Sequence, residues 1–526
     1  MMVASGKNRG ESSRRGVGRT LFFAIAPLVL LLGLGELLVW WLVPTEAQSG
    51  GSLSRGFDRH ESYLLPQEGA GGGWQTAMFD RGEEIVIPPR DDRIRILLFG
   101  GSNTQRFSGD LLEQRFDALG PKGRYEVVNL GREGYGSERV SILVEQAMVL
   151  EPDVVVIYSG HNEFIERGFR AEVEDSLPPM LSPLGELRVA RWLMNLFDRG
   201  KENGRETPSR GSGPEPWEMA YPQFAEIVWP ETQRYMDAFE NNLERIVDIS
   251  TEAGALVLLC TPVGNHLSPP FVSTLAPETP PLVREILEQD LAQARALLPK
   301  RFLAAVSPPL RVRARDWDPF QDGLKREAAL FMGRQKVAVP LRPLSGVLAE
   351  LPSWLERPDQ TGAWTLWPPP ALWMDKVFDL VEAISDVHHP ALTSRETMAV
   401  QEALQRYRSI VDRHPDHPRA LFMVGLCALV LGRSEESREH LEAAARFDRA
   451  PRRAGESVYE RIRSVSRNRE SVTLMDAADI FARRSPDGIV GYEVMADHCH
   501  LHPGAEALIM EDLAQAIHTA WLERGR

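Results

Sequence analysis

The chain has 526 residues, 43% of them hydrophobic and 25% charged, and 60 Lys and Arg against 74 Asp and Glu give a net charge of −14. These values fit a folded globular protein and exclude a disordered chain, a collagen and a polytopic membrane protein. Because general nucleic-acid binders are more often basic, we expect no nucleic-acid partner. The three cysteines, Cys260, Cys427 and Cys499, are too few and too scattered for a disulfide scaffold.

The N-terminus predicts a membrane anchor. Residues 21–43 are apolar apart from Glu36, and a helix of this length can cross a hydrocarbon core of about 30 Å. Residues 1–20 are rich in Lys and Arg, so the positive-inside rule keeps this tail cytoplasmic. A cleaved signal peptide is the alternative, but its apolar core would be only about 7–15 residues long. We therefore expect a single-pass protein whose remaining chain lies outside the cytoplasm.

Regular structure is predicted to begin after a Gly- and Ser-rich tether at residues 44–90. Short apolar runs predict five strands, at 93–99, 125–129, 153–158, 255–259 and 472–475. Helical patterns separate them at 106–119, 137–150 and 235–253. Apolar strands alternating with helices indicate an α/β fold, a three-layer doubly wound parallel sheet. In such a fold the working residues lie at the carboxyl ends of the strands.

Two further segments interrupt this pattern. Residues 266–395 are Pro-rich, and we interpret them as an irregular insertion. Within 396–450, several positions correspond at a spacing of 34 residues, and Gly425 and Gly432 fit one helical hairpin. This period resembles the tetratricopeptide repeat, with about one and a half units visible. We expect the segment to pack on the main domain, although an ordinary amphipathic helix pair would give a similar pattern.

Glycine-rich and polar sequences follow the predicted strands. Gly-Gly-Ser-Asn at 100–103 follows the first strand, and a loop with glycines at 131 and 134 follows the second. Ser-Gly-His-Asn-Glu at 159–163 follows the third, and Asp-His-Cys-His occupies 497–500. A serine at a strand-to-helix turn has backbone N–H groups nearby that can stabilise an oxyanion. Taken alone, however, Gly-Gly-Ser is more often merely a turn and helix cap.

Together the four pieces resemble the blocks of the SGNH hydrolase superfamily, the GDSL-type esterases and lipases, over residues 93–165, 230–265 and 455–520. The resemblance is closest to membrane-anchored relatives with a repeat before the last block, and it implies a flavodoxin-like sheet. It also implies that Ser102 is the nucleophile and that Asp497 and His500 complete a catalytic triad. The implied oxyanion hole consists of the N–H groups of Ser102 and Gly134 and the side-chain amide of Asn162.

Two departures from the family pattern leave these roles intact. The first block reads Gly-Gly-Ser rather than Gly-Asp-Ser, and the third ends in Glu163 rather than aspartate. The predicted domains begin with a basic tail (1–20), an anchor (21–43) and a tether (44–90). The first part of the hydrolase domain follows (91–265), then an irregular insertion (266–395) and a repeat-like insertion (396–450). The last part of the hydrolase domain ends the chain (451–526).

The implied mechanism follows from the residue chemistry. A serine hydroxyl is a weak nucleophile until a base removes its proton. His500 would be that base, and Asp497 would orient its ring and stabilise the imidazolium. The acyl group on Ser102 could pass to water or to another hydroxyl, so a hydrolase and an acyltransferase both stay open. We expect an extracytoplasmic esterase acting on an acylated envelope glycan or lipid.

A second Asp-x-x-His, formed by Asp386 and His389, competes with the later pair. The later pair is favoured because a predicted strand at 472–475 precedes it, and because residues 485–489 resemble the family's lead-in to its last block. The earlier pair leads directly into the repeat-like segment.

The sequence is also compatible with two other classes of function, a metal-binding protein and a non-catalytic interaction protein. Asp497, His498, Cys499, His500 and His502 are all possible metal ligands, but no second ligand group accompanies them, so we expect no metal and no cofactor. The chain could instead be a non-catalytic interaction protein that binds a protein partner through the repeat. The intact set of site residues argues against that reading.

Overall fold

The computed structural model describes residues 91–176, 231–271, 279–299, 392–467 and 471–524, with short stretches elsewhere. The chain divides into two compact units. The larger unit comprises 66–74, 86–169 and 214–526, and it contains the main sheet and all the site residues implied by the sequence. The smaller unit comprises 1–65, 75–85 and 170–213.

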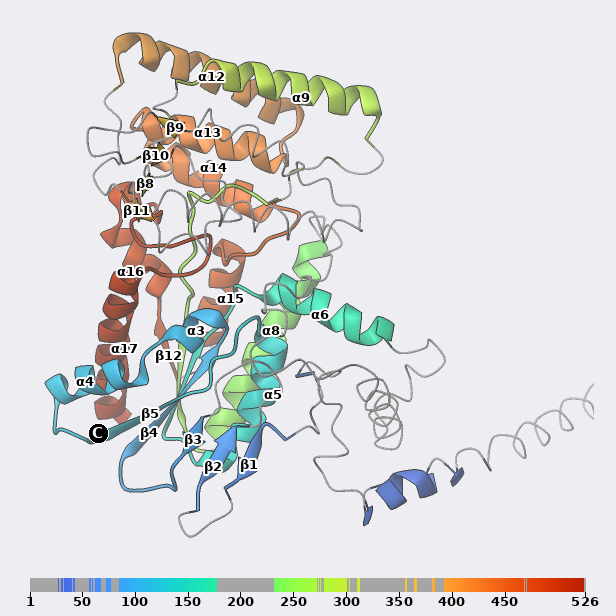
Figure 1. Cartoon of the computed structure of the whole chain (residues 1–526), viewed down its shortest axis with the longest axis vertical. Coiled ribbons are helices and arrows are strands. Elements are labelled where there is room, and N and C mark those ends of the chain that lie inside the picture. The colour runs from blue at the N-terminus through green and yellow to red at the C-terminus, as the bar shows by residue number, and fades with distance from the viewer. Residues whose placement is uncertain are drawn as a thin grey trace, which may run out of the picture. The chain divides into compact units, whose positions relative to one another are not determined.

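Five parallel strands form the main sheet of the larger unit (Figure 1). They are β4 (Ile94–Gly100), β5 (Tyr125–Asn129), β6 (Val154–Tyr158), β7 (Leu256–Cys260) and β12 (Val472–Met475), in the order β12-β7-β6-β4-β5. Read from the other edge, this is the flavodoxin-like strand order. All seven residues of β4 are buried, because a central parallel strand is covered on both faces. The predicted α/β class with a parallel sheet is confirmed.

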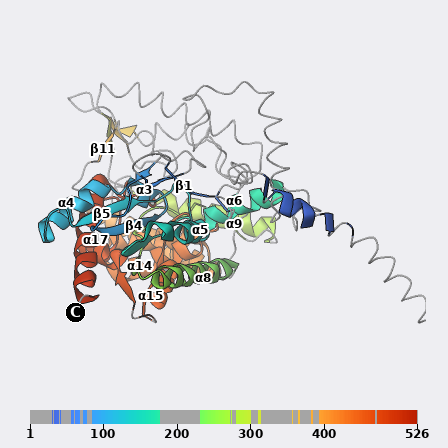
Figure 2. The same cartoon turned by 90° about the horizontal axis from the view of Figure 1, so that it is seen from below.

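Helices cover both faces of this sheet (Figures 1 and 2). On one face lie α4 (Gly109–Leu119), α16 (Ala477–Arg484) and α17 (Pro503–Arg524). On the other lie α5 (Ser137–Ala147), α8 (Glu231–Glu252) and α15 (Glu456–Arg467). Alternate strand residues, such as Ile96 and Leu98, pack into the core under α4 and α17, as the period of two along a strand requires. Two further helices follow strands of this sheet: α3 (Ser102–Arg106) begins just after β4, and α6 (Glu163–Ser176) begins after a short loop that follows β6.

A second hydrophobic core joins four helices in the larger unit. These are α9 (Pro281–Ala296), α12 (Ser394–Arg413), α13 (Pro418–Val430) and α14 (Ser434–Arg446). A Cβ atom at Gly425 would lie 2.7 Å from Leu441 Cγ, so glycine lets α13 and α14 approach closely. A helical hairpin therefore occupies the place expected for it, while its assignment as a tetratricopeptide repeat stays a prediction.

The segment 266–395, predicted to be an irregular insertion, contains a regular helix and strands. Besides α9, it includes β8 (Leu310–Val312), β9 (Leu355–Glu356), β10 (Trp364–Leu366) and β11 (Val381–Ala383), which form an antiparallel sheet in the order β11-β8-β10-β9. The proline at the start of α9 looked like a loop signal, yet proline also suits the first turn of a helix, whose N–H groups have no intrahelical partner.

The predicted tether also includes short strands. β1 (Leu64–Pro66), β2 (Trp74–Thr76) and β3 (Val86–Ile87) form a three-stranded sheet. No helix among the described residues has both the length and the apolar character needed to cross a membrane. Residues 21–26, 28, 29, 32, 40 and 43 of the predicted anchor lie outside the described part of the chain. The anchor therefore stays a prediction.

Candidate active site

Ser102, His500 and Asp497 form a connected chain of hydrogen bonds at the carboxyl end of β4. The Ser102 hydroxyl lies 2.8 Å from His500 Nε2, although 398 residues separate the two positions. His500 Nδ1 lies 2.6 Å from Asp497 Oδ2. Because an ionised carboxylate only accepts hydrogen bonds, Nδ1 carries the proton and Nε2 is left to accept from the serine hydroxyl. The predicted approach of His500 to Ser102, with Asp497 on the other side of the ring, is therefore present.

The loop that carries the acid and the base is shaped by Asp497 itself. Its Oδ1 atom accepts the backbone N–H groups of Cys499 and His500, each at 2.7 Å. An aspartate that caps its own following residues forms a tight turn. Both carboxylate oxygens are therefore engaged, and the side chain is only 7% exposed, so its orientation toward the His500 ring is fixed.

Burial affects the charge of two other histidines, His161 and His498, near the triad. Burial lowers the pKa of His161 to about 3 and that of His498 to about 4, so both rings are neutral at pH 7. Burial by itself would raise the pKa of Asp497, but the adjacent His498 and the hydrogen bonds from His500 hold it well below its usual range. Asp497 is thus the negative charge beside His500, as a triad requires.

Asn162 lies against the residue that precedes the nucleophile. Its Nδ2 group donates to the Tyr135 carbonyl at 3.0 Å, and a Cβ atom at Gly101 would come within 2.4 Å of the same nitrogen. A side chain at Gly101 would displace this amide, so the second glycine of Gly-Gly-Ser leaves room for Asn162 in its present position. An amide carries two hydrogens, and only one of them is used by the Tyr135 carbonyl.

The loop after β5 brings Gly134 next to this amide, since Gly134 directly precedes Tyr135. Gly134 has φ of +73°, a left-handed conformation that glycine adopts without strain. A buried ion pair of Arg139 and Glu166, at 2.8 Å, contacts this loop and stabilises it. Arg139 also donates to the Gly134 carbonyl, and Glu166 accepts the Gly136 N–H at 2.9 Å. Nothing in the sequence pattern around Arg139 and Glu166 indicates this pairing, because the two residues lie 27 positions apart.

Glu163, which replaces the aspartate of the family pattern, contacts Ser137 just after the same loop. It accepts hydrogen bonds from the Ser137 hydroxyl at 2.6 Å and from the Ser137 N–H. The side chain is buried, and burial together with the charge of Glu166 raises the pKa of Glu163 to about 8. The folded chain therefore favours a protonated Glu163 at neutral pH.

This shift predicts a pH dependence of stability. The unfolded chain would release the Glu163 proton near its ordinary pKa of 4.5, whereas the folded chain holds it to about 8. The free energy of unfolding should therefore fall as pH rises through this window and level off above it. Glu163→Gln has no proton to lose, so its stability relative to the parent should improve from pH 5 to pH 9. Denaturant unfolding at both pH values tests this, and parallel changes in the two proteins would contradict it.

The competing Asp-x-x-His and a possible metal site differ in what the structure shows of them. Asp386 and His389 lie outside the described residues. Asp497, Cys499 and His500 have possible ligand atoms within 4.8 Å of one another. However, His500 already uses both ring nitrogens, and His502 Nε2 lies 3.1 Å from the Tyr492 carbonyl. A metal ion would have to displace these contacts, so the geometry favours the hydrogen-bonded triad.

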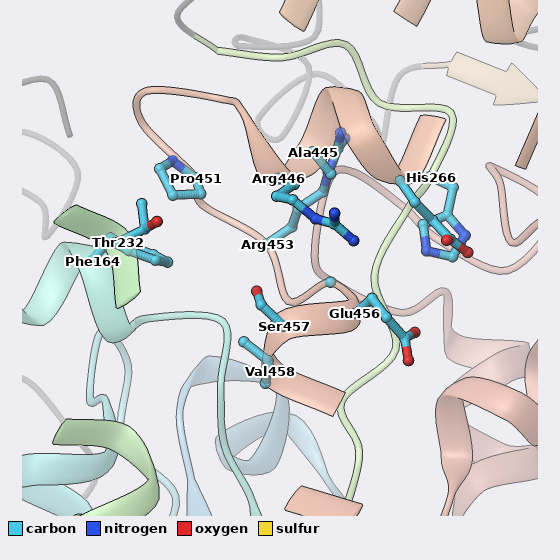
Figure 3. Close-up of a pocket in the computed structure, with 12 residues that line it drawn as sticks. Phe164, Thr232, His266, Ala445, Arg446, Pro451, Arg453, Glu456, Ser457 and Val458 are labelled. Atoms are coloured by element: carbon cyan, nitrogen blue, oxygen red, sulfur yellow. The ribbon is translucent and has the colours of Figure 1, made fainter. Parts of the chain in front are cut away.

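A pocket is lined by twelve residues, among them Phe164, His266 and Arg453 (Figure 3). Its walls come from α6, α8, the loop after β7 and the chain from α14 to α15. Arg453 lines it and donates to the Asn265 carbonyl at 3.0 Å, while Asn265 itself donates through Nδ2 to the Asp497 carbonyl at 2.8 Å. The pocket is therefore connected to the triad through Asn265 but includes none of its three residues.

Comparisons with known proteins give partial likenesses. No family model matches the chain, and no curated protein matches it. A crystal structure of an acetyl xylan esterase is 17% identical, with a TM-score of 0.19, over 33% of this chain and 61% of that one. A structure of a candidate acylhydrolase from Bacteroides fragilis is 14% identical, with a TM-score of 0.18, over 40% of this chain and 66% of that one. The chain spans less than two thirds of either structure.

Proposed function

We propose that the chain is a serine esterase of the SGNH type that works through an acyl-serine intermediate. The observation that carries the proposal is the continuous contact from Ser102 through His500 to Asp497, with distances of 2.8 and 2.6 Å. A serine, an imidazole and a buried carboxylate in this order are the parts that acyl transfer needs. The loops of Gly134 and Asn162 meet beside them, where an oxyanion hole would be required.

Each step of the proposed reaction uses an atom of this site. Ser102 Oγ attacks the ester carbonyl carbon while His500 Nε2 takes the hydroxyl proton. The carbonyl oxygen becomes an oxyanion, which the N–H groups of Ser102 and Gly134 and the Asn162 amide would stabilise. The carbon–oxygen bond to the alcohol then breaks, and the alcohol leaves with the proton from His500. Water repeats the sequence on the acyl-serine, releasing the acid and restoring Ser102.

Labelling with a fluorophosphonate tests this proposal directly. The reagent should form one covalent bond to Ser102 Oγ with loss of fluoride, and peptide mass spectrometry should locate the adduct on the peptide that contains Gly101 and Ser102. A panel of acetyl and longer acyl esters, with and without an added alcohol acceptor, would then define the acyl group and show whether water or a hydroxyl receives it. Absence of labelling, together with absence of hydrolysis across the panel, would refute the esterase.

Asn162→Ala should lower turnover more than substrate binding. The amide would interact with the oxyanion, which exists only in the transition state, so kcat should fall by roughly 10²- to 10³-fold while KM changes little. Steady-state kinetics on the best ester of the panel provide the measurement. An increase in KM at constant kcat would instead place Asn162 among groups that bind the ground state.

The proposed location is outside the cytoplasm, with the chain anchored through residues 21–43. Within this segment, the described side chains of Leu31, Leu34 and Leu37 are each more than half exposed, as lipid-facing residues would be. An esterase in that position would meet acylated glycans or lipids of the cell envelope. A reporter fused to the C-terminus should read as non-cytoplasmic, and carbonate should not release the protein from membranes. A cytoplasmic or freely released protein would remove this part of the proposal.

A further inference from the structure

We propose that Asn103, the residue directly after the nucleophile, is the positioning residue that holds His500 in line with Ser102. The inference rests on the proposed function, because it concerns the base of that reaction. Asn103 has no part in the triad or the oxyanion hole implied by the sequence. Its side chain is nevertheless 3% exposed and reaches across 396 residues to the loop of His500.

The Asn103 amide contacts the two peptide groups that flank His500. Its Nδ2 donates to the Cys499 carbonyl at 2.7 Å, and its Oδ1 accepts the Leu501 N–H at 3.3 Å. One side chain thus satisfies both a donor and an acceptor of the loop, in the manner of a neighbouring strand. The partners also fix which end of the amide carries the nitrogen, since a carbonyl must face a donor.

These two contacts are well placed to fix the base relative to the nucleophile. Asn103 is covalently next to Ser102 in α3, so any shift of the helix moves both residues together. The peptide of His500 is fixed mainly within its own loop, through Asp497 Oδ1 and through a bond from the Ala496 N–H to the His500 carbonyl at 2.8 Å. The Asn103 amide therefore connects the loop directly to the helix that carries the nucleophile.

Asn265 supports the same loop from a different element. Its Nδ2 donates to the Asp497 carbonyl at 2.8 Å, and its N–H donates to the His498 carbonyl at 3.1 Å. Asn265 follows β7, whereas Asn103 follows β4, so the two asparagines hold the two halves of the turn. Of the two, Asn103 is the one that contacts the peptide groups on both sides of His500. We therefore assign to Asn103 the control of the distance between Ser102 and the base.

Two substitutions test this assignment in the full-length protein. Asn103→Ala removes both contacts, and a small displacement of the base should reduce kcat about 100-fold with little change in KM. Asn103→Asp keeps the shape but places a carboxylate oxygen against the Cys499 carbonyl and adds a negative charge near His500. It should lower kcat as well, and it should move the acid limb of the pH profile to higher pH because the charge favours the protonated ring.

Thr261→Val is the matched control. The Thr261 hydroxyl donates to Asp476 at 2.9 Å and accepts the Ala478 N–H at 2.9 Å, so it also makes two hydrogen bonds from a buried side chain. It lies at the end of β7 without contact to the triad, and its loss should affect thermal stability but leave kcat within about twofold. Equal losses of kcat in Asn103→Ala and Thr261→Val would reduce Asn103 to an ordinary structural residue.

A readout independent of turnover separates this inference from the proposed function. The His500 ring can be titrated by NMR in an isotope-labelled protein, with His500→Gln used to assign its signal. The titration midpoint should rise in Asn103→Asp and stay at the parent value in Thr261→Val, whether or not the chain hydrolyses esters. If the parent labels at Ser102 and the Asn103 variants keep both its kcat and its His500 titration, the positioning role is wrong and the esterase stands.

Discussion

Ser102→Ala should abolish ester hydrolysis, with a loss in kcat of about 10⁴- to 10⁶-fold and little loss of folded stability. The hydroxyl is the atom that forms the acyl bond, and no other hydroxyl is described within hydrogen-bond reach of His500 Nε2. In serine hydrolases, removing the nucleophile leaves only the small rate contributed by binding and the oxyanion hole. The substitution deletes one oxygen and one hydrogen bond, so circular dichroism and thermal unfolding should match the parent closely. Hydrolysis of the best ester and fluorophosphonate labelling are the measurements.

His389→Ala provides the matched control for this result. His389 belongs to the competing Asp-x-x-His, and its position near the repeat-like segment predicts that its removal leaves most of the activity. His500→Ala, by contrast, should lose nearly as much activity as Ser102→Ala, because residues of a triad act as one unit. Activity retained in Ser102→Ala would mean that the nucleophile lies elsewhere in the chain.

The sequence was most informative where local patterns and long-range packing agree. The strands β5 and β12 coincide with the predicted runs at 125–129 and 472–475, because a buried parallel strand must be a short continuous apolar segment. The contact between Ser102 and His500 was also anticipated, because residues 100–103 and 497–500 resemble the first and last blocks of the SGNH hydrolases. The resemblance, rather than any local pattern, pointed to this contact across 398 residues.

The missed features depend on partners that no local pattern specifies. Asn103 looks like an ordinary helix-start residue, and its role appears only when the loop of Cys499 is placed against it. Glu166 and Arg139 support the loop of Gly134 through a buried ion pair, but charges 27 residues apart give no sign of meeting. The helix α9 was hidden by the prolines at its start. Each of these depends on tertiary contacts, which sequence periodicity does not encode.

Asp497→Asn should lower kcat by roughly 10⁴-fold through a change of tautomer. In the parent, Asp497 Oδ1 accepts two backbone N–H groups, and Oδ2 accepts His500 Nδ1–H. An asparagine must keep its oxygen on the two backbone donors, so its amide nitrogen would face His500 Nδ1. His500 Nδ1 would then have to accept a hydrogen bond from the amide, and the ring proton would move to Nε2. With Nε2 protonated, His500 could no longer take the proton of Ser102 even though every atom stayed in place.

Asp512→Asn is the control for this change of side chain, since Asp512 pairs with Arg484 on the surface at 2.6 Å and such pairs contribute little.

The stability of Asp497→Asn adds a second test with a defined sign. Because His498 and His500 lower the pKa of the buried Asp497 from its ordinary 3.8, its charge stabilises the fold above that pH, and the benefit disappears on acidification. The stability gap between parent and variant should therefore be wide at pH 7 and narrow as the pH falls below 3.8. A variant with normal kcat would show that the carboxylate does not set the tautomer, and a gap independent of pH would show that its charge is not held by the histidines.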